Sequence, residues 1–157
     1  MNAHGHSYQP LLYMVLLSFV AMYVLMYAMV DTLDNVVPNI NQLYMAGLMT
    51  APMVPIELLL MRRMYTSRSR NLVICSAAII AGAVCFMLIR TQGGVGDKEF
   101  LKSMIPHHGA AVLMVKEAGL KDPEVQQLAR EIIIAQEKEI KQMKQKIKQL
   151  EDEGKQQ

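Results

Sequence analysis

Three long apolar stretches in the first ninety residues constrain what this chain can fold into. Residues 10–30 carry no charged side chain, and residues 40–61 and 72–89 are also strongly apolar. About 20 apolar residues in a helix match the thickness of a membrane's hydrocarbon core. A helix also satisfies every backbone polar group within its own segment, as a lipid environment requires. The pattern therefore predicts three transmembrane helices that form a membrane anchor over residues 1–90.

The first and second stretches each raise a separate question. A signal peptide is the alternative for the first one, but the first ten residues hold no Lys or Arg, and no small-x-small cleavage motif follows. The second stretch contains Pro52 and Pro55. We expect these prolines to kink the helix, because each removes a backbone donor. Cys75 and Cys85 both lie in the third stretch, about 15 Å apart along a helix, and are predicted to stay unbridged.

The loops between the stretches indicate an orientation. Residues 31–39 carry two aspartates and no basic residue, whereas residues 62–70 carry four arginines. Positively charged loops stay in the cytoplasm. We therefore predict a cytoplasmic amino terminus and an extracytoplasmic location for everything after Arg90.

Behind the anchor, the chain becomes polar and helical. Residues 91–96 contain three glycines and are predicted to form a flexible linker. Asp97 suits the N-cap of a helix that stops at Gly119, a residue type typical of the C′ position. The three-residue connection that follows forces an antiparallel neighbour.

The neighbouring helix opens with Asp122 as N-cap and Pro123 as first helical residue, and it is predicted to run to about Glu151. No alternation typical of a strand occurs. The predicted fold is therefore all-α: three transmembrane helices followed by an antiparallel two-helix hairpin over residues 97–157.

The two hairpin helices carry apolar seams with steps of three and four residues. The seam residues are Phe100, Met104, His107, Ala111, Met114 and Ala118 on the first helix, and Ala129, Ile133, Gln136, Ile140, Met143, Ile147 and Leu150 on the second. A hairpin of this size buries too little surface to be secure alone. We expect a second copy to complete a four-helix bundle, so that the protein is a homo-dimer or higher homo-oligomer.

The segment Met104-Ile105-Pro106-His107-His108 is the strongest indication of chemistry. Imidazole and thioether groups together suit copper better than magnesium, calcium or manganese. Met114 lies about 20° from His107 around an ideal helix, and the hairpin brings Gln136, Glu139 and Met143 to the same level. Singly, such histidines and methionines are more often packing residues, and a polar seam residue such as Gln136 often fixes register.

Taken together, these residues predict a metal site. Met104, His107, His108, Gln136, Glu139 and Met143 can converge at one level of the hairpin. The thioethers favour Cu(I), or alternatively Ag(I), over zinc. The paired motif, from Asp97 to about residue 147, resembles the domain-of-unknown-function family 305 (DUF305), which includes CopM-like periplasmic copper-binding proteins.

This resemblance implies a ferritin-like helical bundle, a role in metal tolerance, and copper or silver binding through Met104, His107, His108, Met114 and Met143. Gln136 and Glu139 would then orient the imidazoles. The three-span anchor is a variation on the soluble, exported form of the family and predicts a location in a bacterial inner membrane. The chain departs from the family pattern at Gly109-Ala110, where Gln-Gly is usual, and at Lys146, where an aromatic residue is common. It holds one half-unit where larger members hold two, which favours a dimer. His4 and His6 form a sparser pair, suited at most to weak binding of a divalent ion.

The function predicted from the sequence is therefore metal binding for copper homeostasis, without catalysis. A ferritin-like di-metal oxidase typically uses Glu-x-x-His motifs, and none occurs in the sequence. A structural or regulatory membrane module, in which the seams serve only oligomerisation, is the main alternative. Methionine ladders in the first two spans also leave open a transport path. The small net charge of +2 does not favour nucleic acid as a partner.

Overall fold

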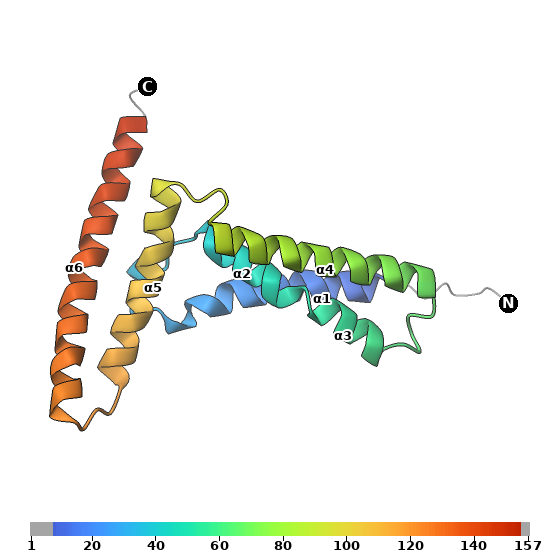
Figure 1. Cartoon of the computed structure of the whole chain (residues 1–157), viewed down its shortest axis with the longest axis horizontal. Helices are drawn as coiled ribbons and strands as arrows, with labels where there is room; N and C mark the ends of the chain where they lie inside the picture. The colour runs from blue at the N-terminus through green and yellow to red at the C-terminus, as the bar shows by residue number, and fades with distance from the viewer. Residues whose placement is uncertain (1–7, 155–157) are drawn as a thin grey trace. The chain divides into compact units, whose positions relative to one another are not determined.

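The protein is helical throughout the part of the chain that the computed structural model describes, residues 8–154 (Figure 1). No strand occurs among these residues, which confirms the all-α prediction. The helices are α1 (Gln9–Leu25), α2 (Ile40–Thr50), α3 (Met53–Leu60), α4 (Arg68–Thr91), α5 (Asp97–Glu117) and α6 (Pro123–Gly154), with the short 3-10 helices η1 (Met26–Met29) and η2 (Leu33–Asn35).

The chain divides into two compact units, which we describe separately. The first, the spanning unit, contains the chain up to Leu25 together with Asn41–Gly93. The second, the hairpin unit, contains α5 and α6 and also residues 26–40, which connect α1 to α2. The connector therefore packs with the hairpin, although it lies between two apolar helices in the sequence.

Three helical segments are long and apolar enough to cross a membrane: Gln9–Met29, Ile40–Leu60 and Arg68–Thr91. They agree with the three spans predicted from the sequence. Their outward side chains are apolar, and Leu17, Leu59 and Leu72 are each about 70% exposed. Large exposed apolar surfaces of this kind are typical of a chain that contacts lipid.

The second span is interrupted at its prolines, as predicted. Helix α2 ends at Thr50 and α3 begins at Met53. The backbone hydrogen bonds across the break are long: Val54 N to Ala51 O is 3.3 Å, and Ile56 N to Pro52 O is 3.4 Å. Proline supplies no backbone donor and its ring crowds the preceding turn, so the helix loosens here.

Small residues allow α2 and α4 to approach closely. A Cβ atom at Gly47 would lie 2.9 Å from Cys85 Sγ, and one at Gly82 would lie 3.0 Å from the Ala51 Cβ. Helices in membranes commonly associate through such small residues. Both Cys75 and Cys85 are free thiols, as the sequence predicted, and Cys85 serves this helix packing.

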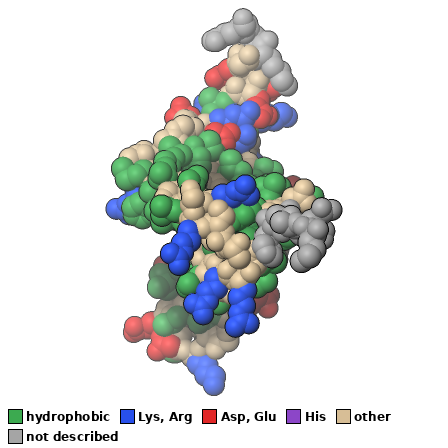
Figure 2. All heavy atoms as spheres, turned by 90° about the vertical axis from the view of Figure 1, so that its right-hand side faces the viewer, with side chains coloured by type: hydrophobic (Ala, Val, Ile, Leu, Met, Phe, Trp, Pro, Cys, Tyr) green, Lys and Arg blue, Asp and Glu red, His purple; other side chains and the backbone are tan. Residues whose placement is uncertain are grey.

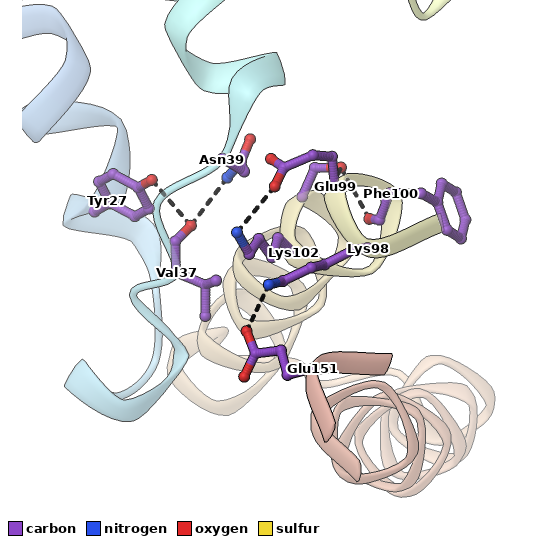
Figure 3. Close-up of polar contacts among 9 residues, drawn as sticks. Tyr27, Val37, Asn39, Lys98, Glu99, Phe100, Lys102 and Glu151 are labelled. Carbon is purple, nitrogen blue, oxygen red and sulfur yellow. Dashed lines mark hydrogen bonds and ion pairs between the residues drawn. The ribbon is translucent and has the colours of Figure 1, made fainter. Parts of the chain in front are cut away.

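In the hairpin unit, α5 and α6 lie side by side and antiparallel (Figure 1). Their core is a cluster of Ile105, Ile140 and Met143. Figure 3 shows the ion pair of Lys98 with Glu151 at one end, at 2.7 Å. On the same pair of helices, Lys116 donates to Glu137 at 2.9 Å, and this hydrogen bond raises the pKa of Lys116.

The predicted start of α6 is confirmed, whereas α6 ends at Gly154, beyond the predicted Glu151, and both ends of α5 are corrected. Asp122 Oδ1 accepts hydrogen bonds from the backbone N–H groups of Glu124 and Val125, at 2.9 and 3.0 Å, so it caps α6 as expected. The N-cap of α5 is Gly96, and Asp97 is the first helical residue. Helix α5 ends through extended backbone at Ala118 (ψ 126°). The chain thus leaves the helix without the left-handed glycine predicted at Gly119.

The connector, residues 26–40, covers one side of α5. A Cβ atom at Gly109 would lie 2.7 Å from Asp31 Oδ1 and 3.1 Å from Val30 Cγ1, so only glycine fits without displacing the connector. Val37 packs against the Ile105 cluster. In Figure 3 the Val37 carbonyl accepts hydrogen bonds from Tyr27 Oη and Asn39 Nδ2, both at 3.0 Å.

An ion pair joins the connector to α6, between Asp34 and Lys144. Within the connector, Asn35 donates to Asp31 at 2.7 Å. The connector thus contacts both helices of the hairpin. The close approach of the connector also gives a physical reason for a glycine at position 109, where the chain departs from the family pattern.

Substitution of Gly109 by leucine is expected to displace the connector. The cost of overpacking is about 1–3 kcal/mol, more than the roughly 1 kcal/mol that leucine gains over glycine in a helix. Hydrogen exchange in the full chain detects the displacement of the connector at the backbone amides of Asn35 and Val36, which are hydrogen-bonded within the connector. We expect protection of both amides to fall by about tenfold. Gly119→Leu is the control, because nothing lies within 4 Å of a Cβ atom there; unchanged protection in the Gly109 variant would contradict the packing.

Candidate metal site

One cavity of the hairpin unit gathers residues of the predicted metal site. It has a volume of about 400 Å³ and lies between α5 and α6. Helix α5 contributes Met104 and His108, and α6 contributes Glu139 and Met143. The other lining residues are Phe100, Leu101, Gln142 and Lys146.

The imidazole of His108 is held in place from across the hairpin. Its Nε2 lies 2.7 Å from Glu139 Oε2. His108 is buried, with 8% of its surface exposed, whereas the side chain of Glu139 is half exposed. A carboxylate on one ring nitrogen fixes the orientation and the tautomer of a histidine, and this is the usual arrangement behind a metal-bound imidazole.

The second ring nitrogen of His108 is available to a ligand. Its Nδ1 is buried and has no hydrogen-bond partner among residues 8–154. Buried polar atoms almost always have a partner, so an unpartnered one calls for an explanation. With the proton on Nε2 and donated to Glu139, the lone pair on Nδ1 is free to bind a metal ion. The residues present therefore fit a metal ion.

Two thioethers line the same cavity. Met143 is buried and belongs to the Ile105 cluster, and the half-buried Met104 packs against that cluster. No group of three or more His, Cys, Asp or Glu side chains among the described residues is placed to hold a metal ion. The cavity thus offers one imidazole and one carboxylate together with the two thioethers, and thioethers suit soft ions.

The other residues of the predicted site lie elsewhere. His107 and Met114 are exposed, and Gln136 is half-buried but does not line the cavity. The rings of His107 and His108 are 5.9 Å apart, with 61° between their planes. The structure thus brings together Met104, His108, Glu139 and Met143. His4 and His6 lie outside the described residues.

The predicted seam of α5 is wrong in phase, whereas that of α6 is confirmed. On α6, Ala129, Ile140 and Met143 are buried as predicted. On α5, the buried residues include Ile105, His108 and Val112, while Phe100, His107 and Met114 of the predicted seam are exposed. The connector covers α5 on the side of Gly109, so the buried face of α5 is wider than the contact with α6 alone and is rotated away from His107.

Sequence reasoning missed Gln142 and Lys146 as cavity residues. Gln142 follows Glu139 by three positions, and Lys146 follows Met143 by three, so both lie on the face that points to the site. This spacing was a usable signal. Lys146 also brings a basic residue to the lining of the cavity.

Comparisons with known proteins bear on this same region. The profile of the family described as Domain of unknown function (DUF305) matches residues 85–147, which include all four residues gathered at the cavity. An uncharacterized protein of Acanthamoeba polyphaga mimivirus is 36% identical over 136 residues, which cover 85% of this chain and 88% of that protein. No solved structure matches.

Proposed function

This chain belongs to the DUF305 family, and on that premise we propose that it is a membrane-anchored protein that binds Cu(I) or Ag(I). The observation that carries the proposal is the unpartnered Nδ1 of His108, buried in a hairpin whose cavity is lined by two thioethers. Met104, Met143 and His108 supply three soft or borderline donors. Zinc is disfavoured, because it typically takes thiolate, imidazole or carboxylate ligands.

The chemistry of such a site is capture and release of an ion. The three donors are neutral when Nε2 carries the proton, so a bound monovalent ion keeps its full positive charge. The nearby carboxylate of Glu139 offsets this charge. Only one carboxylate lines the cavity, whereas di-metal oxidases of ferritin-like type use several. The protein accordingly buffers or hands on the metal for copper homeostasis or tolerance and is not an enzyme.

The anchor gives the site its location. Three apolar helices support a multi-pass membrane protein, and the arginines between the second and third support a cytoplasmic position for that loop. The site then lies on the opposite, extracytoplasmic face. For a bacterial protein this is the periplasmic side of the inner membrane.

A second copy of the chain fits the outer face of the hairpin. Phe100 and Met114 are about half exposed and lie with His107 on one stripe of α5. Leu128 on α6 is similarly exposed. A lone two-helix hairpin buries little apolar area, and pairing these surfaces would complete a ferritin-like four-helix bundle. The stripe predicted from the sequence as an intrachain seam thereby becomes the contact between copies.

Metal titration of the full chain in detergent tests the proposal. Separate titrations use Cu(I), Ag(I), Cu(II) and Zn(II), and light scattering on the same sample measures the mass. We expect Cu(I) and Ag(I) to bind at least about tenfold more tightly than Zn(II), a difference of about 1.4 kcal/mol. The protein mass should be at least twice the 17.7 kDa of one chain. Assembly without any Cu(I) binding would instead favour a structural oligomerisation module.

A further inference from the structure

A groove of the spanning unit lies far from the metal site in the sequence and combines an apolar wall with a basic end. Its volume is about 790 Å³, within the range of roughly 300–1,000 Å³ common for small-ligand sites. Helices α1 and α4 form most of its wall, with Val54 from α3. Along α4 the apolar wall contains Ile74 and then the small residues Ala77, Ala78 and Ala81.

The length of the groove matches one leaflet of a membrane. It extends along α4 from Arg70 to Ala81, eleven residues or roughly 16 Å of helix. Half of a hydrocarbon core of about 30 Å is about 15 Å. An acyl chain lying along α4 would therefore fill the groove from the membrane surface to the midplane.

The outer end of the groove is polar and positively charged. Arg70 lies there with its guanidinium carbon 6.0 Å from the centre of the Tyr8 ring. Among residues 8–154, no acidic side chain forms an ion pair with Arg70. Its charge is thus available to a ligand.

This end of the groove is also structurally fixed. Tyr8 Oη donates to Asn71 Oδ1 at 2.7 Å, and Asn71 Nδ2 donates to the carbonyl of Tyr65 at the same distance. The rings of Tyr8 and Tyr65 are 5.1 Å apart. These contacts join the start of α1 to the loop before α4, so the wall and the charge at its end keep their relative positions.

Further basic side chains surround the loop between α3 and α4. Arg62, Arg63 and Arg68 lie with Arg70 in a segment that holds no acidic residue. Figure 2, which faces this end of the spanning unit, shows Lys and Arg side chains gathered over it. Each basic residue near an anionic membrane surface improves binding by about fivefold.

We propose that this groove binds one anionic phospholipid of the leaflet next to the α3–α4 loop, with an acyl chain along Ala77 and Ala81 and the phosphate at Arg70. The inference rests on the membrane insertion in the proposed function, but it is independent of the metal site. The positive charge of Arg70 favours an anionic headgroup, and the apolar wall, which is as long as one leaflet is thick, favours an acyl chain.

Native mass spectrometry of the full chain in detergent tests this proposal. The probes are phosphatidylglycerol and phosphatidylcholine with identical acyl chains, and we expect at least about a fivefold preference for phosphatidylglycerol. Arg70→Gln should abolish most of that preference. Arg63→Gln, in the same loop but outside the groove, should reduce it less. Equal binding of the two lipids by the wild type would overturn the proposal.

A second pair of variants tests the apolar wall. Ala77→Phe fills the groove and should remove the bound lipid, whereas Ala83→Phe, on the same helix but not lining the groove, should retain it. An equal loss in both variants would overturn the assignment, as would displacement by glycerol phosphate, which lacks acyl chains. Extraction of the chain from membranes by alkaline carbonate would overturn both this proposal and the membrane anchor. Normal insertion and Cu(I) binding without the lipid preference would overturn this proposal alone.

Discussion

Replacing His108 by alanine is expected to lower the affinity of the full chain for Cu(I) by at least about 100-fold. Second-shell partners of metal ligands typically contribute about 10–100-fold, and His108 is proposed as a direct ligand. Its Nδ1 is the buried, unpartnered donor at the site, and no other histidine within residues 8–154 lines the cavity. Competition with a chromophoric Cu(I) chelator measures the affinity.

His107→Ala is the matched control for this variant, because it removes the same side chain from the neighbouring position. His107 lies on the stripe proposed as the contact between copies but does not line the cavity, so the affinity for Cu(I) should stay within about twofold. Equal losses in the two variants would contradict a site centred on His108. If only the His107 variant lost affinity, the site would lie on the outer face of α5.

Three further substitutions separate metal binding from packing. Met104→Leu and Met143→Leu preserve apolar volume at a cost below about 1.5 kcal/mol, so the hairpin should stay folded while a sulfur donor is lost. Glu139→Gln keeps a hydrogen-bond acceptor but removes the charge that orients His108, and a loss of about 10–100-fold is expected. The same chelator competition applies to all three variants.

Ile105→Ala is expected to cost the hairpin about 2–5 kcal/mol of unfolding free energy. Ile105 is 1% exposed, and it packs against Ile140 and Met143 from α6 and against Val37 from the connector. Truncating such a side chain removes apolar contacts and leaves a cavity. Hydrogen exchange of the α5 and α6 amides in the full chain should speed up by at least about 30-fold, which corresponds to about 2 kcal/mol.

Ile134→Ala provides the comparison, because it removes the same atoms from a residue of α6 that is 69% exposed. Its effect should be within about 0.5 kcal/mol, as for other surface positions. Similar exchange rates in the two variants would contradict the placement of Ile105 in the core. The comparison also separates a packing effect from a general change in helix stability, because both substitutions raise the intrinsic helix propensity by the same amount.

The spans and the helix boundaries were largely predictable because they depend on local composition. Runs of about twenty apolar residues identify a spanning helix without knowledge of its neighbours. Asp122 and Pro123 mark the start of α6 through their own backbone and side-chain chemistry. The break at Pro52 likewise follows from a missing donor.

The site was predictable only in part, because its residues meet through tertiary contacts. Hairpin geometry correctly brought Met104, His108, Glu139 and Met143 to one level. It failed for His107, because the seam was assigned from the spacing within α5 alone. One position on a helix corresponds to a rotation of about 100°, so a small error in phase moves a side chain from the core to the surface.

The sequence by itself determined that the chain is helical, where its apolar segments lie, and that imidazole and thioether groups occur together on the hairpin. These properties follow from the residue types and their local spacing. Only the tertiary structure decided that residues 26–40 pack against α5 beside Gly109. That contact widens the buried face of α5, and it leaves His108, in place of His107, with a buried imidazole whose Nδ1 has no partner among residues 8–154.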